Sequence, residues 1–322
     1  MLYPLTFHPI LKERVWGGRK LEALYHKALP PETPIGESWE VSDRPEGVSV
    51  IANGPLAGQS LRWLMENHRA ALLGANAPEG PFPLLIKILD AKETLSVQVH
   101  PPAASATALG GEPKTEMWYI AQAEPNAALY VGLKRGVTRA EFERRIVEGS
   151  VAEALHQVPV RDGDVMFLPS GRLHAIGGGN VIFEIQQNSD TTYRVFDWNR
   201  LGTDGQPRQL HVKQSLQSID FQDFEPRLVG SKYSKNATFK VRFLVNNPLF
   251  RVDLCQVKRG LRFHLRSASV QVLGLVRGRL RVSHTNGDLT VNDGQFVLLP
   301  ACLERVGITA ERQSEFLHVQ PG

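Results

Sequence analysis

Apolar and polar residues alternate along residues 95–100, which predicts a β-strand with two different faces. Gln98 and His100 stand two residues apart and therefore point to the same side of this strand. Pro101 and Pro102 follow at once and end the strand, because proline has no backbone N–H to donate to a ladder. An amide oxygen and an imidazole nitrogen on one face offer half of a metal site. We therefore interpret the segment as one strand of a metal-binding barrel.

The rest of the N-terminal two thirds predicts more strands, joined by glycine and proline turns. Asp162 and Gly163 indicate a tight hairpin turn. Within residues 114–120, Lys114 and Glu116 share a face, so a second strand carries a carboxylate with a cation two residues before it. The predicted strands lie at residues 84–89, 114–120, 165–168 and 181–186.

Two helices are predicted between these strands. Ser60 is typical of an N-cap and predicts a helix over residues 61–73, with Gly74 at its end. Thr138 begins a capping box that opens a second helix, which we expect to continue to about Gln157 because apolar residues recur there at helical spacing.

From about residue 236 onward the pattern is purely β. Alternating runs separated by glycine or asparagine turns predict a second small barrel or sandwich. We therefore expect a mainly β chain with two domains: a catalytic domain at 1–235 that carries a few inserted helices, and a β domain at 236–322. The predicted strands of the second domain lie at residues 239–245, 250–257, 269–276, 278–283 and 295–299.

Composition is that of a globular protein, with 42% hydrophobic and 22% charged residues among 322. The net charge is only +4 and the basic residues are scattered along the chain, which argues against a nucleic-acid partner. Two cysteines without a CxxC motif exclude a disulfide framework. The N-terminus lacks a basic stretch followed by an apolar run, so we expect a cytoplasmic protein without a membrane partner.

A second group of residues completes the candidate metal site. The spacing Gly163-(x5)-Pro169-x-Gly171-(x2)-His174 places a histidine at the start of a strand after a proline–glycine turn. With Gln98, His100 and Glu116, this histidine makes a set of two imidazole nitrogens, one carboxylate and one amide oxygen. Such a set, with open positions, suits Zn²⁺ and also Fe²⁺ or Mn²⁺.

These motifs have the spacing of the two cupin motifs, with glutamine in place of the usual first histidine. The chain resembles the type I mannose-6-phosphate isomerases (phosphomannose isomerases) of the cupin superfamily, most closely their short bacterial branch. The resemblance covers residues 1–235 well and the C-terminal part only in general pattern. It rests on residues 16–18, 36–40, 95–101, 114–116, 168–174 and 188–194.

The resemblance implies two jelly-roll barrels and a zinc-dependent aldose–ketose isomerase that interconverts mannose 6-phosphate and fructose 6-phosphate through a cis-enediol. It implies one Zn²⁺ per chain and a monomer or weak homodimer. Arg194 matches a catalytic arginine that would stabilise charge or hold the phosphate, and Lys114 matches a lysine that would bind phosphate or transfer a proton. The proton-transfer base is not identified. The implied zinc ligands are Gln98, His100, Glu116 and His174.

The second barrel repeats the motif in degraded form. Gly294 and Pro300 keep their spacing, but Arg305 stands where the histidine ligand would be. We therefore expect this barrel to bind no metal.

Other interpretations stay open at this point. The same scaffold could hold Fe²⁺ for redox chemistry, act on a different sugar, or bind a sugar phosphate without catalysis. Glu116 and Lys114 could form an ordinary surface ion pair. Arg194 could pair with Asp190 or Asp197 instead of facing a substrate.

Overall fold

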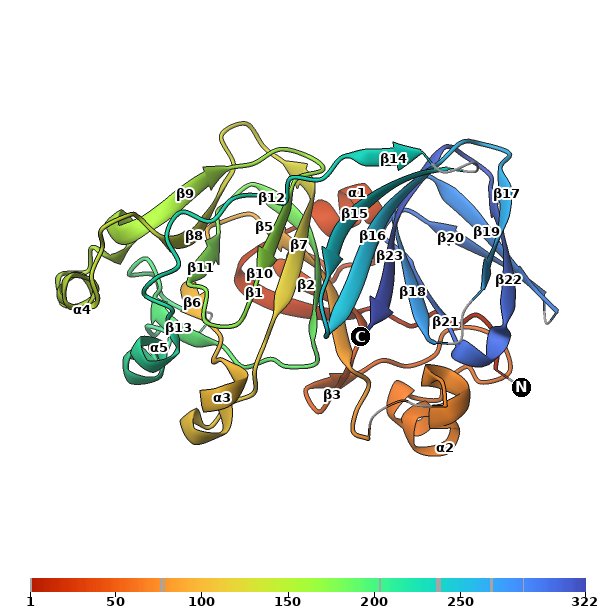
Figure 1. Ribbon diagram of the computed structural model, residues 1–322, viewed down its shortest axis with the longest axis horizontal. Helices are drawn as coiled ribbons and strands as arrows, with labels where there is room; N and C mark the ends of the chain where they lie inside the picture. Colours follow the sequence, from red (N-terminus) through yellow and green to blue (C-terminus); the bar gives the residue numbers. More distant parts are fainter. Residues whose placement is uncertain are drawn as a thin grey trace.

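The computed structural model describes residues 2–75, 77, 79–202, 204–235, 239–266, 269–285 and 287–322. Over these residues the chain forms two barrels that lie side by side, each made of two antiparallel sheets (Figure 1). The mainly β, two-barrel fold predicted from the sequence is confirmed.

The first barrel has a larger and a smaller sheet. The larger sheet contains, in order, β1 (Ile10–Gly18), β2 (Ile35–Val41), β5 (Leu84–Ala91), β12 (Asn180–Gln187), β7 (Glu116–Ala123) and β10 (Val165–Leu168). The smaller sheet contains β13 (Tyr193–Phe196), β6 (Val97–Val99), β11 (His174–Ile176), β8 (Ala128–Leu133) and β9 (Leu155–Pro159). A short hairpin outside both sheets pairs β3 (Asp43–Arg44) with β4 (Gly47–Val48).

The second barrel repeats this arrangement. Its larger sheet contains β14 (Tyr233–Lys235), β15 (Lys240–Asn246), β16 (Phe250–Val257), β23 (Ser314–Pro321), β18 (Gln271–Arg277) and β21 (Phe296–Leu299). Its smaller sheet contains β17 (Arg262–Arg266), β22 (Arg305–Ala310), β19 (Arg279–His284) and β20 (Gly287–Asn292). β14 lies just before the predicted domain division at residue 235, yet it pairs with β15 of the second barrel. The division after residue 235 therefore stays a prediction.

The helices lie in the connections between strands, and one of them differs from its prediction. In the predicted helix over residues 61–73, the Ser60 hydroxyl accepts a hydrogen bond from the backbone N–H of Trp63 at 3.0 Å. The second predicted helix is too long: it ends at Glu148, because Gly149 takes a left-handed φ of +72°, and a 3₁₀ turn and β9 follow. The helices are α1 (Lys20–Tyr25), α2 (Leu61–Leu73), α3 (Ala103–Ala106), α4 (Arg139–Glu148) and α5 (Val212–Ser218), with 3₁₀ turns η1 (Thr107–Leu109), η2 (Val151–Ala154) and η3 (Ala301–Leu303).

The turn at Asp162 and Gly163 forms as predicted, with a φ of +85° at the glycine. It is not a hairpin, however, since β9 and β10 on its two sides belong to different sheets. A turn that connects strands of two different sheets needs the same residues as a hairpin turn that connects two paired strands. The sequence pattern therefore does not distinguish the two kinds of turn.

The larger sheets of the two barrels pack against each other. One continuous apolar cluster includes Ile86 and Phe183 from the first barrel and Val252 and Leu317 from the second. The N-terminal segment adds to this contact, because Leu5 bridges to Leu298 in β21. Among the described residues, no helix is both long and apolar enough to span a membrane.

Candidate metal centre

The smaller sheet of the first barrel brings three predicted site residues into neighbouring positions. Gln98 on β6 pairs with His174 on β11 on one side and with Arg194 on β13 on the other. Glu116, the first residue of β7, comes from the opposite sheet. Residues that are far apart in the sequence thus meet inside one barrel.

His100, Glu116 and His174 form a compact buried cluster. Nε2 of His100 lies 3.5 Å from Oε2 of Glu116, and Nε2 of His174 lies 3.4 Å from Oε1 of the same carboxylate. One ligand atom from each residue lies within 4.8 Å of the others. Lys114 Nζ is 3.0 Å from Glu116 Oε2, and both side chains are buried, so the alternative of a surface ion pair is wrong.

Backbone carbonyls set the orientation of both imidazole rings. Nδ1 of His100 lies 2.8 Å from the carbonyl oxygen of Thr191, and Nδ1 of His174 lies 2.9 Å from that of Arg172. A carbonyl oxygen only accepts, so each Nδ1 donates a proton and each Nε2 keeps a lone pair. Neither Nε2 has a hydrogen-bond partner in the described structure, nor does Oε1 of Glu116.

Electrostatics keep this donor set in the form that binds a metal. Burial lowers the pKa of His174 to about 3 and also lowers the pKa of His100. Burial alone would raise the pKa of Glu116, but Lys114 and His100 outweigh it and hold that pKa well below its usual value. Two neutral imidazoles and one carboxylate, buried and without partners, fit a divalent ion.

A cavity of about 420 Å³ lies beside the cluster, and the side chains of Gln98, Lys114 and Arg194 line it. Arg194 Nη1 donates to the carbonyl oxygen of Gln209 at 2.8 Å, while Nε has no hydrogen-bond partner in the part of the chain described. Burial lowers the pKa of Arg194, and so does the nearby Arg208.

The alternative pairing of Arg194 with a neighbouring aspartate is absent among the described residues. Asp197 instead accepts hydrogen bonds from Arg200 and Arg208. Asp190 is paired with Lys87, whose Nζ lies 3.3 Å away. Arg194 therefore keeps a buried N–H without a hydrogen-bond partner beside the cavity.

Sequence reasoning missed two further charged residues of this cavity, Lys87 and Glu184. They face each other across β5 and β12, with Lys87 Nζ 3.7 Å from Glu184 Oε2. Trp118 Nε1 donates to Glu184 Oε1 at 3.0 Å, and burial raises the pKa of Glu184 to about 7. The signal was present: each is a charge in the middle of an apolar run that predicts a buried strand.

Two jelly-roll barrels with a His/Glu/His cluster inside the first define a cupin fold with a candidate metal site. The family model "Phosphomannose isomerase type I, catalytic domain" matches residues 5–116. The mannose-6-phosphate isomerase of Streptococcus mutans is 35% identical over 301 residues, 93% of each chain. The chain belongs to the type I mannose-6-phosphate isomerase family.

Solved structures support this assignment. The mannose 6-phosphate isomerase of Bacillus subtilis superimposes with a TM-score of 0.89 at 28% identity over 99% of both chains. A mannose 6-phosphate isomerase solved bound with zinc and yttrium shares the fold, with a TM-score of 0.76 at 18% identity over 99% of this chain and 100% of that one.

Proposed function

We propose that this chain is a zinc-dependent isomerase that interconverts mannose 6-phosphate and fructose 6-phosphate, with one ion per chain. The observation that carries the proposal is the buried cluster of His100, Glu116 and His174, whose unengaged donor atoms converge beside a cavity lined by charged side chains of both signs. Membership of the isomerase family supports the same reaction.

His100, Glu116 and His174 would hold the ion, with Gln98 as the fourth donor. Gln98 lines the cavity and lies in register with His174, which supports its inclusion. When bound, a divalent ion supplies a Lewis acid that polarises the sugar oxygens.

The chain's own residues then accomplish three tasks. Arg194 offers its free N–H to the phosphate or to the negative charge that develops on the enediol, since a guanidinium suits oxyanions. Lys114 holds Glu116 in its ionised form through their buried ion pair. Glu184 is the carboxylate that we assign to moving the proton between C2 and C1, because it lines the same cavity, lies outside the His/Glu/His cluster, and has a pKa that burial raises to about 7.

A coupled assay for fructose 6-phosphate formed from mannose 6-phosphate tests this function. The protein is measured as purified, after chelation, and after zinc is restored. We expect chelation to abolish turnover and zinc to restore it. A folded, zinc-loaded protein without turnover on this substrate would contradict the proposal and favour another sugar or a non-catalytic binding role.

A further inference from the structure

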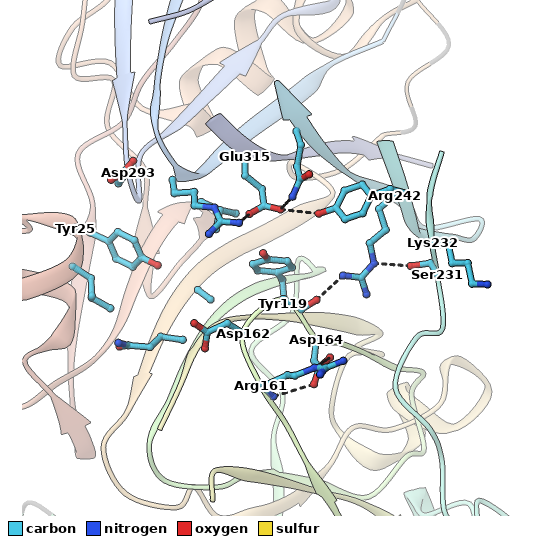
Figure 2. A pocket seen from close by; sticks show the side chains of 18 residues that line it. Tyr25, Tyr119, Arg161, Asp162, Asp164, Ser231, Lys232, Arg242, Asp293 and Glu315 are labelled. Carbon is cyan, nitrogen blue, oxygen red and sulfur yellow. Dashed lines mark hydrogen bonds and ion pairs between the residues drawn. The ribbon is translucent and has the colours of Figure 1, made fainter. Parts of the chain in front are cut away.

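A second and larger cavity, of about 820 Å³, lies between the two barrels (Figure 2). Its walls come from β7, from the turn that includes Asp162, from α1, and from strands β15, β16, β18 and β23 of the second barrel. Among the described residues it shares no lining side chain with the metal cavity. It is therefore a separate candidate site.

Two phenols, Tyr25 and Tyr119, border this cavity from the first barrel. Both rings meet Phe183 edge to face, at centroid distances of 5.6 Å and 6.5 Å. The Tyr119 side chain is only 3% exposed, and no hydrogen bond from a described residue engages its hydroxyl, which opens onto the cavity. A phenol hydroxyl can both donate and accept a hydrogen bond. The hydroxyl of Tyr119 is therefore available to a polar occupant of the cavity.

Basic and acidic side chains both line the cavity, and two of them, Arg161 and Asp164, lie 3.9 Å apart. On one side stand Arg242 and Lys232, neither of which has a carboxylate within ion-pair distance in the described structure; Figure 2 shows them beside Ser231. Arg242 donates from Nε to the Ser231 hydroxyl at 2.9 Å and from Nη1 to the Gly163 carbonyl at 2.6 Å, which fixes its guanidinium. This side suits an anionic group.

The opposite side is acidic. Asp293 and Asp162 lie near Tyr25, and Oδ1 of Asp293 is buried without a hydrogen-bond partner among the residues described. Carboxylates accept hydrogen bonds from hydroxyl groups, and phenols both donate hydrogen bonds to hydroxyl groups and accept them. This side suits the hydroxyls of a polyol.

Glu315 lies between the two sides, but its carboxylate is not available to a ligand. Its carboxylate is buried and accepts hydrogen bonds from Tyr233 at 2.8 Å and Gln256 at 2.8 Å, and it pairs with Arg277 at 2.7 Å. Its charge is thus compensated, and the hydroxyl of Tyr119 is the group that stays available in the middle of the cavity.

We propose that this cavity binds a phosphorylated carbohydrate as a second ligand. The phosphate meets Arg242 and Lys232, and the sugar hydroxyls meet Tyr119, Tyr25 and Asp293. Guanidinium groups bind phosphate in planar, bidentate geometry, and the cavity volume exceeds that needed for a hexose phosphate. The site does not depend on the reaction assigned to the first barrel.

The test is isothermal titration of glucose 6-phosphate into the zinc-loaded full chain carrying Arg194→Ala, which weakens binding in the metal cavity. We expect one saturable site in this background. Arg242→Gln and Tyr119→Phe should each weaken it about tenfold, the effect of losing one strong hydrogen bond. Lys232→Gln should weaken it about threefold, as for an exposed charge.

The matched control is Arg251→Gln, which removes an arginine that pairs with Asp253 outside the cavity and should leave the affinity unchanged. Inorganic phosphate represents the phosphate group of the proposed ligand, and mannitol represents its hydroxyl groups. Phosphate binding should depend on Lys232, and mannitol binding should depend on Tyr119. Should Arg242→Gln fail to fold, Lys232→Gln and Tyr119→Phe still decide the matter. Absence of saturable binding, or equal affinity in these two variants and the background, overturns the proposal. Failure of the isomerase assay leaves this result unaffected.

Discussion

The larger sheets of the two barrels correspond strand for strand, although the smaller sheet of the first barrel has the additional strand β13. Equivalent positions in the two barrels can be matched by register, and they carry different residues. Glu116 on β7 pairs with Leu168, the residue before Pro169, and Gln271 on β18 pairs with Leu299, the residue before Pro300. The glutamine of the second barrel therefore stands where the first has its buried carboxylate.

The histidine position differs in the same way. His174 and Arg305 each begin a strand five residues after the proline, and their partners in the register are Gln98 and Arg266. Two arginines thus occupy the places of an imidazole and an amide. Both arginines are exposed, whereas His174 is buried, so neither arginine brings a metal-binding atom to this position inside the second barrel.

The difference extends to packing. The first barrel keeps a cavity of about 420 Å³, whereas the equivalent space in the second, beside Gln271 and Leu299, is only about 10 Å³. Nε2 of His318 lies 2.7 Å from Oε1 of Gln271, so these polar atoms satisfy each other. The same fold is thus filled in one barrel and left with unsatisfied polar atoms in the other, and those atoms mark the candidate metal site.

Glu116→Gln gives the first barrel the residue of the second, and we expect the largest effect here. Loss of the carboxylate should remove zinc from the purified chain and reduce isomerase activity to the assay background, because two neutral imidazoles and amides hold the ion weakly. Zinc content by mass spectrometry and the coupled assay measure both. Gln271→Glu is the control and should change neither; one zinc per chain in Glu116→Gln would show that the cluster is not the metal site.

Glu184→Gln separates chemistry from metal binding. Glu184 on β12 pairs with Trp118 in the register, as His318 pairs with Leu273 in the second barrel. We expect kcat to fall roughly 10²-fold, the contribution of a general base, while zinc content stays at one per chain. An unchanged kcat would remove Glu184 from the proton transfer. His318→Gln is the matched control.

His318 should make the free energy of unfolding of the chain decrease at low pH. Burial lowers the pKa of His318 to about 4, so the folded state binds fewer protons than the unfolded state below pH 6.5. Stability is therefore complete above pH 6.5 and falls as pH drops toward 4, by about 3 kcal/mol from this residue. Denaturant unfolding at several pH values should show a shallower loss for His318→Gln. The exposed His264, changed to Gln, should behave as wild type.

The smallest effect is expected at a helix cap between the barrels. The Ser60 hydroxyl caps α2, which packs against η3 of the second barrel. Ser60→Ala should lower the free energy of unfolding by about 1 kcal/mol, as measured by denaturant titration, with zinc content and activity unchanged. Thr138→Ala, which removes the equivalent cap of α4 away from the second barrel, provides the comparison. Loss of zinc in the Ser60 variant would mean that α2 supports the metal centre.

Much of this fold could be predicted from the sequence because strands and caps are local. Alternation placed β6, β15, β16, β18, β19 and β21 within a few residues, but not β17 and β20, and Ser60 marked α2. Prediction failed where a glycine interrupted a longer pattern: apolar spacing continued past Gly149, but its left-handed backbone ended the helix. The turn at Gly163 was recognised, but not the sheets that it connects.

The sequence by itself determined which residue types the candidate metal centre offers and on which strands they lie, since a QxH strand and the Pro-x-Gly-x-x-His turn are short-range patterns. Only the tertiary structure decided that Lys114 and Glu116 are buried together and that two carbonyls orient the histidines. It alone brought Lys87 and Glu184 into the same cavity and opened a second one between the barrels. The burial of a polar atom, its desolvation and whether it finds a hydrogen-bond partner depend on every neighbour that packs around it. Those neighbours come from distant parts of the chain.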